Sequence, residues 1–179
     1  MVEKNYESAE HRKYKYRVVF QGNNVIDQDW GTALFQDLGS SPASMEASKI
    51  VDFYGCLPGH AIEQADAEQA YIQAKLRGPK TWVTLPKEYW PAHFHQIDNP
   101  VVPLEYALYG HPDAGGYWEL HCNSILQKAG LRPVGEWASF MHHPSLIVLL
   151  GIYVDDFKMA GPKKNLAAAW RLFNKAIEM

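Results

Sequence analysis

The sequence has little cysteine, no long apolar run and no excess of positive charge. Its two cysteines, Cys56 and Cys122, form no CxxC motif, so we expect buried, reduced thiols rather than a zinc site or a disulfide framework. The longest apolar run, residues 146–154, is about half of what a membrane span needs, and the polar N-terminus predicts no signal peptide. The net charge of −3 means that nucleic-acid binding would need a local basic patch.

Aromatic and aliphatic side chains, in contrast, are plentiful. The chain has 179 residues, of which 47% are hydrophobic, including 6 Trp, 10 Tyr and 7 Phe. This composition suffices for a packed core in one or two domains, and the charged fraction of 21% argues against wholesale disorder.

Hydrophobic patterning predicts a mixed α+β chain. Residues 1–10 are expected to be loose and residues 22–39 to form a loop. Strands are expected at about 18–20, 61–66, 145–153 and 157–160, and helices at about 42–55, 117–129 and 165–177. The order strand, helix, hairpin, helix in the C-terminal half suits a split βαβ, ferredoxin-like sheet.

The predicted helices have recognisable ends and faces. Ser41 is expected to cap the first helix, which Gly55 or Pro58 would end, and Gly130 is expected to close the second. The side chains expected to face the core are Met45, Ile50, Val51 and Phe53 in the first helix and Leu166, Trp170, Phe173 and Ile177 in the last.

Three aspartates stand at the ends of predicted strands. Asp66 ends one strand, and Asp155 and Asp156 occupy the turn of a hairpin. If these strands are neighbours, three carboxylates meet at one end, where they repel one another unless cations are bound. Two Mg²⁺ ions, roughly 3.5–4 Å apart, could then assist an in-line phosphoryl transfer. An Asp-Asp pair is also ordinary turn chemistry, so only the combination points to catalysis.

Four ordered motifs, spanning the chain from about residue 11 to its end, resemble those of copia-type retrotransposon reverse transcriptases. The segment Tyr-Val-Asp-Asp at 153–156 follows an apolar strand and resembles their YxDD signature. Residues 64–71, Gln-Ala-Asp-Ala-Glu-Gln-Ala-Tyr, are similar to their first catalytic motif. Residues 108–110, Leu-Tyr-Gly, followed by Trp118, resemble the middle motif, and residues 15–22 the entry to the fingers.

The resemblance implies an RNA-directed DNA polymerase, a nucleotidyltransferase that adds deoxynucleotides to a primer 3′-hydroxyl with two Mg²⁺ or Mn²⁺ ions. The implied metal ligands are Asp66, Asp155, Asp156 and the Ala67 carbonyl, of which the three aspartates are catalytic. The residues implied for the deoxynucleoside triphosphate are Lys15, Arg17, Gln69, Ala70, Tyr71 and Asp113, and those for the primer end are Tyr153 and Val154.

It also implies a ferredoxin-like palm, at 46–73 and 118–179, with a small interleaved fingers subdomain at 1–45 and 74–117. The family's thumb and ribonuclease H domains are expected to lie outside this chain, as in a fragment of a longer polyprotein. The expected partners are an RNA or DNA template with its primer, deoxynucleoside triphosphates and the rest of a retrotransposon polyprotein. The expected location is a cytoplasmic particle or the nucleus, without membrane attachment or secretion.

The middle motif departs from the family. Residues 111–116 read His-Pro-Asp-Ala-Gly-Gly, where the family reads Leu-Lys-Gln-Ala-Pro-Arg, and losing two cations weakens attraction to phosphates. A catalytically inactive remnant, serving as a nucleic-acid-binding or scaffold module, is therefore a second hypothesis. A third is another palm-type enzyme, such as a nucleotide cyclase, although the Leu-Tyr-Gly motif would then be unexplained.

Single residues also have simpler interpretations. Tyr71 could be a core aromatic, and residues 11–17 could be a solvated strand edge, where lysines discourage pairing with other chains. The histidine pairs at 93 and 95 and at 142 and 143 invite a zinc interpretation, but no cysteine lies near them in the sequence.

Overall fold

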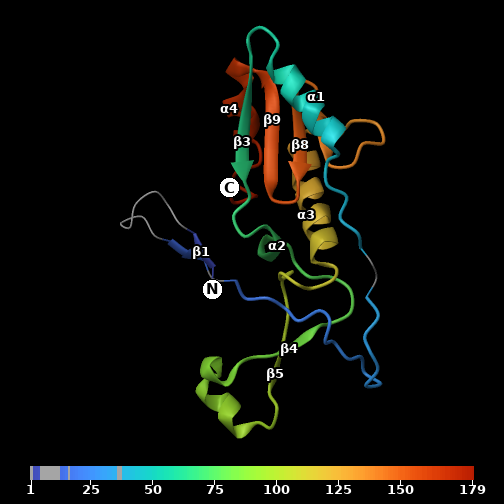
Figure 1. Cartoon of the computed structure of the whole chain (residues 1–179), viewed down its shortest axis with the longest axis vertical. Coiled ribbons are helices and arrows are strands. Elements are labelled where there is room, and N and C mark those ends of the chain that lie inside the picture. Colours follow the sequence, from blue (N-terminus) through green and yellow to red (C-terminus); the bar gives the residue numbers. More distant parts are fainter. Residues whose placement is uncertain (1, 5–12, 16, 36–37) are drawn as a thin grey trace.

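The computed structural model describes residues 2–4, 13–15, 17–35 and 38–179, and it confirms a mixed α+β chain (Figure 1). In this part of the chain the largest sheet is antiparallel, in the order β3-β9-β8-β7-β6. Its strands are β3 (His60–Asp66), β9 (Asp156–Pro162), β8 (Val148–Tyr153), β7 (Phe140–His143) and β6 (Arg132–Pro133). Two short pairs lie outside it: β1 (Val2–Lys4) with β2 (Lys13–Lys15), and β4 (Trp82–Thr84) with β5 (Val101–Pro103).

The middle of this sheet combines distant parts of the sequence. Strand β9 lies between β3 and β8 and runs antiparallel to both, so β3 and β8 point in the same direction. Since β3 precedes β8 by about eighty residues, the chain must cross from one end of the sheet to the other between them, and the helix α3 (Ala114–Lys128) lies in that connection.

Helices cover both faces of the sheet. On one face, α1 (Met45–Gly55) packs across β3, β9 and β8, and its Ala47 and Val51 are buried with Phe140 and Ala160. On the other face, α3 and α4 (Lys163–Arg171) enclose the larger core with Leu150, Phe157 and Met159. The one-turn helix α2 (Ala70–Gln73) lies beyond the end of β3 (Figure 1). The β4–β5 connection carries the 3₁₀ helices η2 (Lys87–Tyr89) and η3 (Ala92–Gln96).

The first helix begins later than predicted. Its N-cap is Ser44, whose hydroxyl accepts a hydrogen bond from the Ala47 N–H at 3.2 Å. Ser41 instead donates its backbone N–H to the Glu119 carboxylate at 2.6 Å and stays outside the helix. The buried face is Ala47, Val51 and Gly55, spaced by four residues. Val51 is therefore buried as predicted, whereas Met45, Ile50 and Phe53 are exposed, contrary to prediction. Small residues line this face because the helix lies close against the sheet.

Several strands also differ from the prediction. Residues 18–20 form no strand, and β1 lies within the segment expected to be loose, of which residues 1 and 5–10 are outside the described part. Strand β8 begins at Val148 because residues 144–147 form a turn in which Ile147 has a φ of 55°. The prediction that a strand ends at Asp66 is confirmed.

The predicted C-terminal core face is confirmed. Leu166, Trp170, Phe173 and Ile177 are all buried, although α4 ends at Arg171 and turns continue the chain. Helix α3 begins at Ala114, before the predicted start, and ends just ahead of Gly130, whose φ of 94° suits a helix end.

The two cysteines lie in different surroundings. Cys122 is a buried free thiol, as predicted, but Cys56 is exposed, because it follows α1 at the surface. Burial raises the pKa of the Cys122 thiol to about 12.

Among the described residues, no helix is long and apolar enough to cross a membrane.

The close approach of α1 to the sheet generates a stability prediction. A Cβ added at Gly55 would collide with the Ile62 side chain and lie 3.4 Å from the Ala160 Cβ. Gly55→Ala should therefore lower the free energy of unfolding by about 1–3 kcal/mol, the usual cost of overpacking. The matched control is Gly39→Ala, where a Cβ meets nothing within 4 Å, and urea unfolding would compare the two. Equal stability of both variants would contradict the packing of α1 on β3.

Candidate functional site

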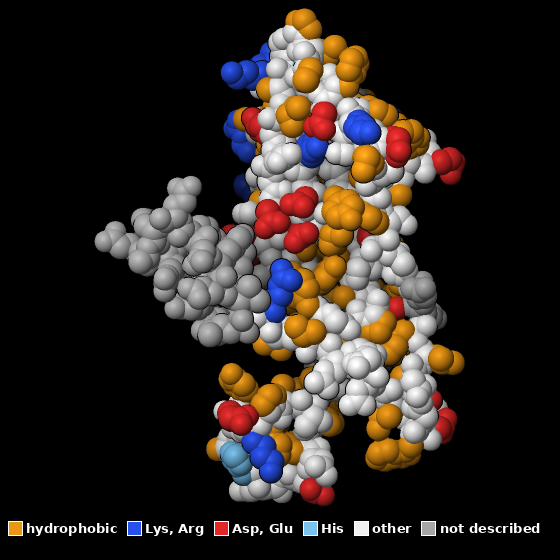
Figure 2. Space-filling model, viewed as in Figure 1, with side chains coloured by type: hydrophobic (Ala, Val, Ile, Leu, Met, Phe, Trp, Pro, Cys, Tyr) orange, Lys and Arg blue, Asp and Glu red, His pale blue; other side chains and the backbone are white. Residues whose placement is uncertain are grey.

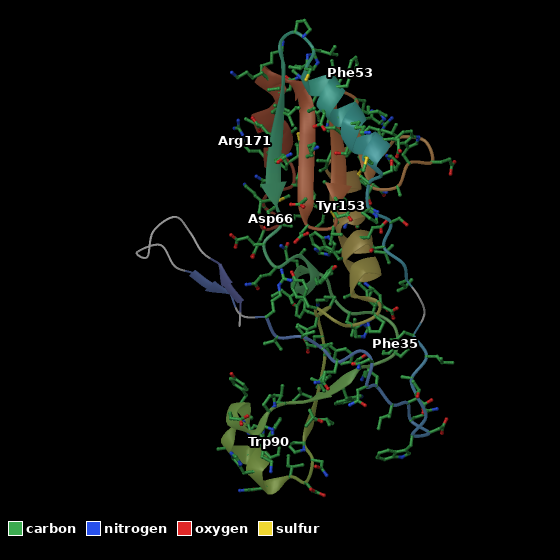
Figure 3. The ribbon with its side chains drawn as sticks, viewed as in Figure 1. Phe35, Phe53, Asp66, Trp90, Tyr153 and Arg171 are labelled. Carbon is green, nitrogen blue, oxygen red and sulfur yellow. The ribbon has the colours of Figure 1, made fainter. Side chains whose placement is uncertain are left out.

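The sheet places three aspartates at one end. Asp66 is the last residue of β3, Asp156 is the first residue of β9, and the two are directly opposite each other in the register. Directly opposed residues project from the same face of a sheet. Asp155 lies in the turn between β8 and β9, and its carbonyl accepts a hydrogen bond from the Ala67 N–H at 2.8 Å. Figure 2 shows acidic side chains gathered at this end, and Figure 3 shows Asp66 beside Tyr153.

The environment of Asp156 disfavours its charged form. The pKa of Asp156 is raised above its ordinary value, first by burial and then by the charges of Asp155 and Asp66. In the described part of the chain, no three or more His, Cys, Asp or Glu side chains are arranged to hold a metal ion. Carboxylate oxygens are the ligands that Mg²⁺ prefers. Without a bound cation the three carboxylates repel one another, which keeps their oxygens apart.

The turn that carries Asp155 is strained and firmly held. Tyr153 pairs with Asp156, so the two-residue turn is Val154 and Asp155, and the prediction that Asp156 lies in the turn is wrong by one position. Val154 has a φ of 59°. A β-branched residue rarely adopts this conformation and does so only where its surroundings enforce it. The buried indole of Trp118 donates to the Val154 carbonyl at 2.7 Å, and the Ala67 N–H donates to the Asp155 carbonyl. These two bonds fix the position of Asp155.

Trp118 was not among the predicted site residues, although it supports the turn. It lies in α3, and its ring is 2% exposed. A buried indole N–H needs an acceptor, so a tryptophan on the core face of a predicted helix was a usable signal. Which carbonyl it meets depends on tertiary packing and could not be inferred.

An aromatic and basic group lies next to the carboxylates. The rings of Tyr71, in α2, and Tyr109 have centroids 4.7 Å apart, and the Arg17 guanidinium lies 4.7 Å from the centroid of Tyr109. Burial raises the pKa of both tyrosines, the charge of Asp155 raises it further and Arg17 lowers it. The carboxylates and this group are therefore close enough to share one electrostatic environment.

The segment between β3 and α2 presents backbone N–H groups. Gln69 adopts a left-handed conformation, with a φ of 52°, and Ala70 is buried. No hydrogen bond from the N–H of either residue is made to another described residue. The segment is anchored nearby, because the Gln73 amide donates to the carbonyls of Glu68 and Glu178 at 2.7 and 3.0 Å.

Two predicted nucleotide-binding residues are not brought to the carboxylates by any described contact. Lys15 is the last residue of β2, and its side chain lies outside the described residues. Asp113 precedes α3, is 6% exposed and has a carboxylate oxygen that meets no described hydrogen-bond partner. Its N–H donates to the His111 ring at 3.2 Å, so Asp113 belongs to a buried cluster at the start of α3.

An open groove of about 660 Å³ runs along the α1 face of the sheet to the carboxylates. Lys158 lines it and is held at 2.8 Å by the Ser48 hydroxyl and at 3.0 Å by the Asp52 carboxylate. Other residues that line it are Ser44, Gln64, Asp66, Gly151, Tyr153 and Asp156. With 60% of its surface exposed, Tyr153 is open to a bound molecule at the end of this groove.

The raised pKa of Asp156, caused first by burial and then by repulsion from Asp155 and Asp66, generates a pH-dependent prediction. Because its folded pKa is raised, ionisation of Asp156 costs stability as the pH rises through the acid range above the ordinary value of 3.8. Asp156→Asn should raise the free energy of unfolding at neutral pH by roughly 0.2–1 kcal/mol, as expected for relief of a like-charge cross-strand pair. The gain should vanish below the ordinary pKa.

Urea unfolding at several pH values would measure this effect. The control is Asp98→Asn, which removes an exposed aspartate in a loop and should leave the pH dependence unchanged. A neutral-pH loss of stability in Asp156→Asn would mean that the carboxylate is held by favourable partners rather than opposed by like charges.

Comparisons with family models, curated proteins and solved structures found no match to this chain. Its activity must therefore be inferred from the residues and geometry of the site, in which a carboxylate cluster, an Arg-Tyr-Tyr group and an open groove meet at one end of an antiparallel sheet.

Proposed function

We propose that the chain is the fingers and palm of an RNA-directed DNA polymerase similar to copia-type reverse transcriptases. The observation that carries this proposal is the placement of Asp66 opposite Asp156, with Asp155 in the adjoining turn. The strand order supports it, because a split βαβ palm would have two parallel strands joined through a helix with a third strand between them, and β3 and β8 flank β9 with α3 in their connection. Residues 1–45 and 74–117 would form the fingers.

The proposed reaction is attack of a primer 3′-hydroxyl on the α-phosphate of a deoxynucleoside triphosphate, with release of pyrophosphate. Asp66 and Asp155 would be the main ligands of two Mg²⁺ or Mn²⁺ ions, with support from Asp156 and the Ala67 carbonyl. Such ions, when bound, neutralise the phosphates and lower the cost of the developing alkoxide.

The rest of the site would act by positioning. The Arg17 guanidinium would bind the phosphates with Lys15, and the N–H groups of Gln69 and Ala70, which have no described hydrogen-bond partner, would hold the triphosphate. Tyr71 would lie beneath the sugar. The exposed ring of Tyr153 and the neighbouring Val154 would contact the primer end, which the groove along β9 could accommodate.

A second candidate function is a catalytically inactive remnant that binds nucleic acid or serves as a scaffold. The observation in its favour is the start of α3, where the sequence departs from the family and Asp113 is buried beside His111. Because it is buried, the Asp113 side chain cannot reach a nucleotide without a local rearrangement. The two candidates differ in Mg²⁺-dependent primer extension.

The first test of the proposal is Asp155→Asn. A neutral amide binds Mg²⁺ poorly, and losing several kcal/mol of transition-state stabilisation should lower extension by roughly a thousandfold or more. Extension of a labelled primer on RNA and DNA templates would measure it. Asp98→Asn serves as the control for charge loss, and circular dichroism should show an intact fold. Activity of Asp155→Asn within about tenfold of wild type would reduce Asp155 to a turn residue.

The second test concerns the choice of sugar. If Tyr71 lies beneath the sugar, its ring excludes a 2′-hydroxyl by steric overlap, so discrimination comes from a clash with the ribonucleotide. Tyr71→Val should raise ribonucleotide use relative to deoxynucleotide use by at least about tenfold, or roughly 1.4 kcal/mol. Tyr71→Phe should have little effect. Parallel single-nucleotide assays would decide, and equal losses with both sugars in Tyr71→Val would make Tyr71 a core aromatic.

A further inference from the structure

We propose that Tyr109 is a positioning residue for the incoming nucleotide. Its ring would hold the Arg17 guanidinium toward the triphosphate and would support Tyr71 beneath the sugar. This inference rests on the proposed function, because it assigns a role within the same nucleotide site. It concerns a residue that is neither a metal ligand nor one of the residues implied to touch the nucleotide.

The contacts of the Tyr109 ring carry the inference. Arg17 lies 4.7 Å from its centroid, within the range of a cation–π interaction, and the Tyr71 ring lies 4.7 Å away at an interplanar angle of 58°. Arg17, Tyr71 and Tyr109 come from three separate segments of the chain. Tyr109 is the member that contacts both of the others, so it can coordinate them.

The same ring lies in the field of the carboxylates. The charges of Asp155 and Asp66 act on Tyr109, and that of Asp155 acts on Tyr71. The guanidinium on Tyr109 is therefore near the end of the sheet where a metal-bound triphosphate would lie. A long arginine side chain without this support would be free to adopt many rotamers, and ordering it would weaken nucleotide binding.

The backbone around Tyr109 is fixed against the segment that carries Arg17. The Tyr109 carbonyl accepts a hydrogen bond from the Phe20 N–H at 2.7 Å. Gly110 has a φ of 87°, and a Cβ there would collide with the Phe20 carbonyl. The close approach of these two segments brings the guanidinium onto the ring, and a glycine at position 110 permits it.

The Tyr71 side of the group is fixed as well. The Ala107 N–H donates to the Ala74 carbonyl at 2.8 Å, and Leu76 donates to Glu105 at 2.8 Å. These bonds tie the chain that follows α2 to the chain that precedes Tyr109. The contact between the two tyrosine rings is therefore built into the fold rather than made by two mobile side chains.

A series of substitutions separates the cation–π contact from simple packing. Tyr109→Phe keeps the ring, and it should leave the dissociation constant for a deoxynucleoside triphosphate in Mg²⁺ unchanged within about twofold. Tyr109→Leu keeps apolar bulk but removes the ring face, and it should weaken binding about two- to fivefold. Tyr109→Ala should also reduce discrimination against the ribonucleotide, because Tyr71 loses its support.

A double-substitution cycle provides the decisive measurement. Arg17→Met and Tyr109→Leu should be non-additive, since each removes the same contact, so the double variant should bind the nucleotide no more weakly than Arg17→Met alone. Tyr106→Leu is the matched control, because Tyr106 is exposed and belongs to the same segment without contacting Arg17 in the described structure. The dissociation constant of each variant for a deoxynucleoside triphosphate would be measured at equilibrium, without primer.

The outcomes distinguish this inference from the proposed function. The role of Tyr109 would be overturned if Arg17→Met and Tyr109→Leu had additive effects, or if Tyr109→Phe bound the nucleotide as weakly as Tyr109→Leu. Primer extension by the wild type would still uphold the polymerase in that case. Non-additive nucleotide binding without any primer extension would support Tyr109 and overturn the proposed reaction. A wild-type chain that binds no nucleotide in Mg²⁺ would overturn both.

Discussion

The antiparallel register of β3 against β9 is the constraint on which the candidate site depends. Phe157 and Met159 alternate with Asp156 and Lys158 along β9, and burying the two apolar residues directs the polar ones to the α1 face. A slip of one residue would turn Asp66 away from Asp156 and toward the core, where an unpaired carboxylate is costly. The hydrophobic core therefore sets the position of the catalytic candidates.

The second half of the site depends on loops that are anchored to one another. Arg17, Tyr71 and Tyr109 lie outside the large sheet, and backbone hydrogen bonds between their segments hold them together. Their cationic and aromatic groups face an acidic cluster. A chain with a net charge of −3 can bind phosphates only through such local arrangements, with cations bridging carboxylates and nucleotide.

Local sequence signals predicted the parts of the site that depend on nearby residues. The strand ending at Asp66, the hairpin around Asp155 and the buried face ending at Ile177 all follow from alternation, turn residues or helical spacing. Long-range packing decided the rest. The hydrogen bond from Trp118 to Val154 and the contact of Arg17 with Tyr109 join segments that are far apart in the chain. The cap at Ser44 is local, but Ser41 is an equally good cap by sequence.

The central claim is that the end of β3 and the β8–β9 turn jointly bind divalent cations. Paramagnetic broadening of backbone amide signals by Mn²⁺, followed by NMR on the labelled chain, would locate the ion directly. The account predicts that substoichiometric Mn²⁺ broadens the signals of residues 66–67 and 154–156 first, and that Mg²⁺ in excess restores them. Broadening centred elsewhere, such as on His93 and His95 in η3, or uniform broadening without a preferred site, would contradict it.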